Sequence, residues 1–249
     1  MRSLAPLRGM SGQLSVATSS PWVWVSQGVD PTSAIRAPPR ERRSFRAEFV
    51  TPASMKHELP TAGRPEVAFC GRSNQGKSTL IGKLLGSPKL VRASKAPGCT
   101  RTVNYFALRE SGGEAAPPHA YLVDLPGYGF ARESKKAVRG WNSTVMDYLE
   151  GRVSSVLRRT FVLVDSRHGL QRDDEEMLSF LSGGGVENMV VLTKVEKASP
   201  VQLLKSLEGV FQVALRHPAT VPVVHCVSAH KGLGMDEFSN TLFCLTAGH

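Results

Sequence analysis

A short apolar run, Val67-Ala-Phe-Cys70, leads directly into the glycine-rich stretch Gly71-Arg-Ser-Asn-Gln-Gly-Lys-Ser78. This stretch fits the pattern G-x-x-x-x-G-K-[ST], and a helix is expected from Gln75 to Leu85. In such a strand–loop–helix arrangement the glycines let backbone N–H groups converge on phosphates, and the helix N-terminus adds the positive end of its dipole. The stretch therefore predicts a phosphate-binding loop at the end of a buried strand.

Two side chains of this loop suit a nucleoside triphosphate. Lys77 would neutralise the β- and γ-phosphates, and the Ser78 hydroxyl would coordinate Mg²⁺. Because the charge of Lys77 faces the phosphoryl group that is transferred, we assign it a catalytic as well as a binding role. The other loop residues expected to bind the nucleotide are Ser73, Asn74, Gln75, Gly76 and Thr79.

A second motif, Asp124-Leu-Pro-Gly127, ends another apolar run. Together with a phosphate-binding loop, Asp124 in this place can hold the Mg²⁺ shell while the Gly127 N–H meets the γ-phosphate. Between the two motifs lies Pro97-Gly-Cys-Thr100, and the Thr100 hydroxyl would coordinate the same ion when the γ-phosphate is present. We therefore expect Gly127 and Thr100 to take part in the reaction, and Ser78 and Thr100 to be the metal ligands.

Base recognition is predicted from two motifs in the second half of the chain. Thr193-Lys194-Val195-Glu196 stands where an N/T-K-x-D motif belongs, and its carboxylate would accept from the N1–H and the exocyclic amine of guanine. Adenine offers no matching donors, so such a site selects guanine. Glu196 replaces the expected Asp, and its extra methylene moves the carboxylate by about 1.5 Å. Ser228-Ala229 would supply a backbone N–H to the base oxygen.

Apolar runs alternate with longer mixed segments through the rest of the chain. We expect strands at 67–70, 102–109, 120–123, 160–165, 189–193 and 221–227, and helices at 75–85, 135–150, 173–181, 201–215 and 235–244. The second and third strands form a hairpin around the Gly- and Pro-containing segment 110–119. The prediction is an α/β fold: a mostly parallel six-stranded sheet with helices on both faces and one antiparallel edge strand.

The 249 residues carry a net charge of +10, and the excess lies in the first part of the chain. Residues 1–110 hold 17 Lys and Arg against 6 Asp and Glu, a balance that favours polyanionic partners. Residues 1–46 are expected to be a disordered N-terminal extension with the composition of an organelle transit peptide, and an extension without a targeting role is the alternative. The 4 cysteines are scattered without a CxxC pair, which argues against a zinc site or a disulfide framework.

Taken together, these motifs resemble those of the EngB family of ribosome-biogenesis GTPases. The resemblance rests on Pro65–Leu80, Ser94–Thr100, Asn104–Phe106, Asp124–Ala131, Trp141, Asp165–His168 and Leu192–Lys194. It implies a Ras-like G domain over residues 47–249, GTP and GDP as ligands, Mg²⁺ as cofactor, and a role in assembling the large ribosomal subunit through its rRNA and proteins. The transit-like extension implies an organellar form, in the mitochondrion or alternatively in a plastid.

Two residues bear on how fast such an enzyme works. Tyr128 stands where Ras-type enzymes have a glutamine that orients the attacking water, and a phenol lacks the paired donor and acceptor, so we expect slow intrinsic hydrolysis. Asn74 resembles the asparagine of GTPases that bind K⁺, whose charge stabilises phosphoryl transfer. An asparagine that only braces its own loop is the alternative.

Basic residues gather on the two segments that would respond to the γ-phosphate: Lys89, Arg92, Lys95, Arg101, Arg132, Lys135 and Lys136. They would touch rRNA phosphates in the GTP state, and a solvated basic face is the alternative. The chain departs from the family pattern at Gln75, Ala96, Cys99 and Glu196. Because Glu196 replaces the expected aspartate, the alternative function is an interaction module that keeps the nucleotide fold with weak or lost GTP binding. We expect the protein to be a monomer. We expect no membrane insertion, because no apolar run is long enough to cross a bilayer.

Overall fold

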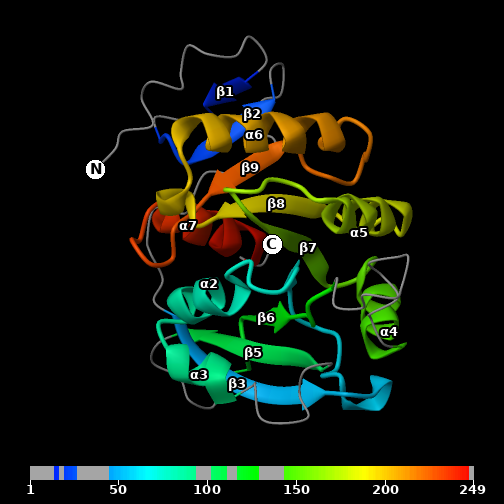
Figure 1. Cartoon of the computed structure of the whole chain (residues 1–249). Coiled ribbons are helices and arrows are strands. Elements are labelled where there is room, and N and C mark those ends of the chain that lie inside the picture. The colour runs from blue at the N-terminus through cyan, green and yellow to red at the C-terminus, as the bar shows by residue number, and fades with distance from the viewer. Residues whose placement is uncertain are drawn as a thin grey trace.

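The computed structural model describes residues 14–16, 20–26, 45–93, 102–110, 117–128 and 143–246. Within them, nine strands form one sheet in the order β1-β2-β9-β8-β7-β4-β6-β5-β3, stacked from top to bottom in Figure 1. The strands are β1 (Leu14–Val16), β2 (Val23–Ser26), β3 (Phe45–Ala53), β4 (Glu66–Gly71), β5 (Val103–Glu110), β6 (Ala120–Asp124), β7 (Leu157–Asp165), β8 (Asn188–Thr193) and β9 (Val223–Cys226).

Helices cover both faces of this sheet. They are α2 (Lys77–Leu84), α3 (Pro88–Ala93), α4 (Ser143–Arg152), α5 (Arg172–Gly183), α6 (Pro200–Ala214) and α7 (Met235–Thr246), with the 3-10 turns η2 (Lys56–Glu58) and η5 (Val195–Lys197). One buried cluster joins the sheet to α4, α5 and α6, and a second joins it to α2, α3 and α7. Val162 and Val164 face the first cluster while Phe161 and Leu163 face the second, as expected for a strand buried on both sides.

The predicted Ras-like α/β fold is confirmed. The six expected strands are β4 to β9: β6, β4, β7, β8 and β9 run parallel, and β5 pairs with β6 as the predicted antiparallel hairpin. The expected number of strands is wrong, because β3 adds to β5 and β2 adds to β9, both antiparallel, and β1 continues beyond β2. The three additional strands extend the predicted six-stranded sheet beyond its two edges, β9 and β5.

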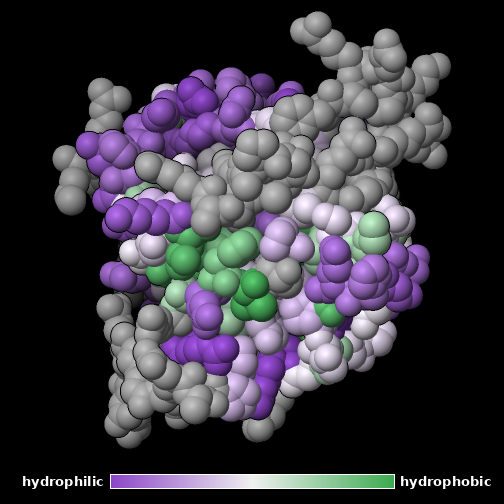
Figure 2. All heavy atoms as spheres, turned by 90° about the horizontal axis from the view of Figure 1, so that it is seen from below, coloured by the Kyte–Doolittle hydropathy of each residue, from purple (hydrophilic) through white to green (hydrophobic). Residues whose placement is uncertain are grey.

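The sequence pattern hides β3 for a physical reason. Its pairing with β5 shifts register between Phe49 and Thr51, so the alternation of inward and outward residues breaks there, and Pro52 follows. Because the nitrogen of proline has no hydrogen to donate to a neighbouring strand, proline is mostly found in edge strands and at bulges. Val50, at the irregularity, is 43% exposed. From the β3 side, apolar side chains gather in one area bordered by hydrophilic ones (Figure 2).

The N-terminal extension also needs a correction. We expected disorder through residue 46, but Val23, Trp24 and Val25 are buried beside β9, and Trp24 is only 1% exposed. The Trp24 indole N–H donates to the Pro21 carbonyl over 3.0 Å, and Ser20 Oγ donates to Glu237 Oε1 over 2.5 Å. This segment is part of the sheet because its apolar side chains reach the cores on both faces.

Helix ends fall near their predicted places, with one informative exception. The helix expected from Gln75 begins at Lys77, because Gly76 caps it in the left-handed conformation with φ of 90°. Residues 135–142, the expected start of the helix that precedes β7, lie outside the described part of the chain. No helix of the described ranges is long and apolar enough to cross a membrane.

Candidate functional site

A cavity of about 630 Å³ opens where β4 and β6 end, a size typical of ligand sites. It is lined by residues 71–79 of the predicted phosphate-binding loop, by Thr102 and Asn104 of the β5 entry, by residues 124–127, and by Lys194. In open α/β sheets the crevice beyond the carboxyl ends of the strands is the usual ligand site. The structure thus brings together all the predicted loop residues, Asp124, Gly127 and Lys194.

The backbone of the loop explains why glycine is needed before Lys77. Gly76 adopts φ of 90°, a backbone conformation that residues with a side chain rarely adopt. There is room for a side chain, because the nearest atom to a Cβ placed there would be Lys194 Cε at 3.6 Å. Backbone strain, not lack of space, therefore excludes other residues. Asn74 is also left-handed, with φ of 63°, and asparagine tolerates this conformation better than most residues.

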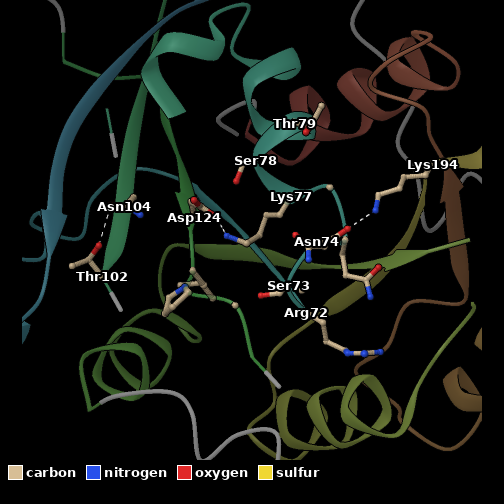
Figure 3. A pocket seen from close by; sticks show the side chains of 16 residues that line it. Arg72, Ser73, Asn74, Lys77, Ser78, Thr79, Thr102, Asn104, Asp124 and Lys194 are labelled. Atoms are coloured by element: carbon tan, nitrogen blue, oxygen red, sulfur yellow. Dashed lines mark hydrogen bonds and ion pairs between the residues drawn. The ribbon is translucent and has the colours of Figure 1, made fainter. Parts of the chain in front are cut away.

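Lys77, Ser78 and Asp124 converge at the centre of the cavity. The Lys77 ammonium forms an ion pair with Asp124 Oδ1, and the carboxylate is largely buried. Figure 3 shows Ser78 pointing to the side where Asp124 lies, whereas the side chain of Thr79 points away from it. A phosphate group entering the cavity would meet the positive end of α2 and the Lys77 charge together.

The donors of the site fit Mg²⁺. The described residues contain no group of three or more His, Cys, Asp or Glu side chains that could hold a metal ion. Mg²⁺ commonly needs only one or two protein ligands because substrate phosphates and water complete its shell. The hydroxyl of Ser78 and the carboxylate of Asp124 are hard oxygen donors in the same cavity. Thr100, the other predicted ligand, lies outside the described residues, as does Cys99.

Residues at the end of β8 brace the loop from behind. Thr193 Oγ1 lies 2.6 Å from the Gln75 carbonyl oxygen, to which it donates. Lys194 Nζ donates to the Asn74 carbonyl and lies 3.0 Å from Asp165 Oδ2. Thr193 and Lys194 therefore hold the loop in shape, and their contacts with the nucleotide stay a prediction.

Asp165, at the end of β7, belongs to the Asp165–His168 stretch, and no sequence pattern gives it a role in the site. Its carboxylate accepts two hydrogen bonds from the Arg167 side chain, at 2.9 and 2.7 Å, and its N–H donates to Gln75 Oε1 over 2.6 Å. Burial alone would raise the pKa of Asp165, but the hydrogen bonds from Arg167 and Lys194 hold it well below its usual range. The carboxylate stays ionised and anchors the loop through Lys194, and the Asp165 N–H anchors it through Gln75.

The two predicted base-recognition motifs lie side by side. Val227 N–H donates to the Leu192 carbonyl over 2.8 Å, which joins the segment after β9 to the end of β8. Glu196 lies in η5, and its Oε2 atom is buried without a hydrogen-bond partner within the described residues. The Ser228 N–H donates to the Leu233 carbonyl over 2.9 Å, so within the Ser228-Ala229 pair the Ala229 N–H remains the predicted donor to the base oxygen.

Comparison with known proteins agrees with this geometry. A family described as 50S ribosome-binding GTPase matches residues 66–194. A "Probable GTP-binding protein EngB" of Chelativorans sp. (strain BNC1) is 44% identical over 193 residues, which cover 76% of this chain and 84% of the relative. The chain belongs to the EngB family of GTPases. A relative with the same description from Cereibacter sphaeroides is 42% identical and covers 83% of this chain and 91% of its own.

The fold agrees with the same family. A crystal structure of a probable GTP-binding protein EngB superposes with a TM-score of 0.54 at 24% identity, covering 73% of this chain and 98% of that one. A bacterial selenocysteine-specific elongation factor matches with a TM-score of 0.50 over 73% of this chain and 28% of its own. Both show the fold. As an EngB-family member the chain is a GTP hydrolase with a P-loop.

Proposed function

We propose that this EngB-family GTPase is a nucleotide-dependent switch that assists assembly of the large ribosomal subunit in an organelle. The observation that supports it most directly is the cavity in which Lys77, Ser78 and Asp124 converge, together with the family description as ribosome-binding GTPases. The basic excess of the chain suits a partner rich in phosphate.

Different residues of the chain bind the phosphates, the metal ion and the base. The backbone N–H groups of the loop cradle the phosphates, and Lys77 exchanges its Asp124 partner for phosphate oxygens. Mg²⁺ held by Ser78 and Asp124 would neutralise charge on the transferred group. The Gly127 N–H contacts the γ-phosphate, which only GTP carries. Guanine is oriented by the two base-recognition motifs, through Thr193, Lys194, Glu196 and Ala229. K⁺ is proposed to bind at Asn74.

Hydrolysis would release the segments that follow Gly127 and surround Thr100. Lys89 and Arg92 of the predicted basic set lie on α3, and the others lie outside the described residues. We propose that this basic set contacts rRNA phosphates while GTP is bound, which links nucleotide state to affinity for the subunit. The chain is proposed to act as a monomer in the mitochondrion, with a plastid as the alternative.

One experiment tests the proposal as a whole. The tagged full-length chain is sedimented with organelle lysate in the presence of a non-hydrolysable GTP analogue or of GDP. We expect it to migrate with large-subunit particles in the analogue and not in GDP, and the Lys77→Ala variant to remain at the top of the gradient. Equal migration in both nucleotides would contradict the switch, and absence of nucleotide binding would favour an interaction module.

Targeting is tested separately. Residues 1–46 fused to a fluorescent protein are expected to direct it into the organelle. A fusion that stays in the cytosol would exclude a targeting role for this extension.

A further inference from the structure

Tyr128 follows Gly127 directly, yet its side chain lies in the core and not in the cavity. It is 1% exposed and belongs to the cluster under α4, α5 and α6. Its hydroxyl donates to Asp174 Oδ1 over 2.9 Å. The phenol therefore does not replace the water-orienting glutamine of Ras-type enzymes, and its hydrogen bond calls for another explanation.

Asp174 joins three parts of the site. It is fully buried in the first turn of α5, and its Oδ2 accepts from the Gln171 N–H over 2.9 Å. The same oxygen lies 3.7 Å from Nη1 of Arg72, the second residue of the phosphate-binding loop. Figure 3 shows the Arg72 side chain extending away from Lys77, on the far side of the loop. One carboxylate thus holds the loop and the residue after Gly127 against α5.

The backbone closes this arrangement. Arg72 and Tyr128 form an isolated parallel bridge, so the two segments that border the cavity are joined by backbone and by side chains. Burial and the nearby charges raise the pKa of Tyr128 well above its usual range, so the hydroxyl remains a donor. Because consecutive Cα atoms are about 3.8 Å apart, fixing residue 128 restricts where the Gly127 N–H can lie.

We propose that Tyr128 and Asp174 are positioning residues that hold the Gly127 N–H toward the γ-phosphate and thereby set the preference for GTP over GDP. This inference rests on the proposed function of the cavity as a GTP site. A ligand shifts a conformational equilibrium only through interactions that differ between the states. The γ-phosphate is the group that distinguishes the two nucleotides, so loosening Gly127 should affect GTP alone.

The test uses Tyr128→Phe in the full chain, which keeps the ring in the core and removes the hydroxyl. Binding of fluorescent GDP and of a fluorescent non-hydrolysable GTP analogue is titrated, and kcat and KM are measured with GTP. We expect affinity for the analogue to fall about 3- to 10-fold, the scale of one lost hydrogen bond, while GDP affinity stays within about 2-fold. The kcat for GTP hydrolysis should also fall.

Tyr105→Phe is the matched control. Tyr105 is also a fully buried tyrosine, and its hydroxyl lies 3.5 Å from the buried Glu66 carboxylate at the start of β4, the end of that strand away from the cavity. Its loss is expected to lower thermal stability and to leave the ratio of GTP-analogue to GDP affinity unchanged. A ratio changed equally in both variants would show a general effect of weakened packing and overturn the proposal.

Asp174→Asn provides a second route, also if Tyr128→Phe does not fold. It removes the charge that faces Arg72, and we expect binding of the analogue to fall by a larger factor than binding of GDP. In the double variant the losses should be less than additive, because both act through one contact. Unchanged or equally reduced binding of both nucleotides would overturn the proposal. Failure of the unmodified chain to bind either nucleotide would instead overturn the proposed function, and the same titration reports it.

Discussion

Replacing Glu196 by glutamine is expected to weaken binding of both GTP and GDP about 10- to 150-fold. The Oε2 atom of Glu196 is buried and has no hydrogen-bond partner in the described part of the chain, and Glu196 is not among the residues that line the cavity. We predict from its position in the motif that it accepts from the guanine N1–H and amine. A hydrogen bond to a charged group contributes about 1.5–3 kcal/mol, and about 1.4 kcal/mol corresponds to a tenfold change in Kd. An amide can accept one of the two donors but presents its own N–H₂ to the other.

Titration of Glu196→Gln with fluorescent GTP, GDP and ATP measures this loss. Because the carboxylate selects guanine, ATP binding should not change, and the preference for GTP over ATP should shrink by the same factor. Glu196→Asp is the matched control: it keeps the charge and moves it by about 1.5 Å, and we expect Kd to stay within about tenfold of the unmodified chain. Guanine-nucleotide affinity within threefold of normal for Glu196→Gln would refute the assignment of this residue to base recognition.

Four further outcomes are expected. Thr193→Val removes the donor to the Gln75 carbonyl, which should cost about 1–3 kcal/mol of unfolding free energy and weaken GTP binding, whereas unchanged values in urea titration and nucleotide binding would exclude the bracing role. Trp24→Ala should lower the unfolding free energy by about 3–5 kcal/mol, and a loss below about 1 kcal/mol would show that β2 is not part of the core. Replacing Na⁺ by K⁺ should raise kcat in the unmodified chain and not in Asn74→Ala; equal rates in both salts would rule out a potassium site. The fourth concerns Glu66, whose pKa is raised to about 7, chiefly by burial and despite the nearby Arg152 charge. Since the folded protein then holds a proton that the unfolded chain releases, stability should fall as pH rises from about 4.5 to 7, by up to about 3 kcal/mol, and Glu66→Gln should flatten this slope in urea titrations at pH 5 and 7.5.

Much of the fold can be predicted because the inner strands are buried on both faces. The run Phe161-Val-Leu-Val164 in β7 and the run Met189-Val-Val-Leu192 in β8 are continuous apolar segments of strand length, and mixed segments with helical periodicity separate them. The strands added outside the predicted six lack such a signal. The bulge and Pro52 interrupt β3, and β2 has four residues within a segment rich in serine, so each becomes recognisable only beside the strand with which it pairs.

The candidate site can also be predicted only in part from the sequence. Lys77, Ser78 and Asp124 can be placed from sequence because motif spacing puts them at the ends of parallel strands, which meet at one edge of the sheet. The bracing contacts cannot. No sequence pattern indicates a role for the Gln75 side chain. Its Oε1 atom accepts from the Asp165 N–H over 2.6 Å only because the folded sheet brings the end of β7 beside the loop. Tyr128 and Asp174 lie 46 positions apart, and no local pattern indicates that a hydrogen bond joins them.

The strand formed by residues 23–26 limits how the amino-terminal region can be trimmed. Under the organellar targeting proposed above, a peptidase that cut after Arg46 would remove Trp24 from the interior and leave β9 without its antiparallel neighbour β2. The uncovered strand would then offer its backbone groups to other chains, a known route to aggregation. Cleavage that keeps the whole sheet would have to spare the chain from β1 (Leu14–Val16) onward, so a presequence removed under the proposed targeting would lie before Leu14.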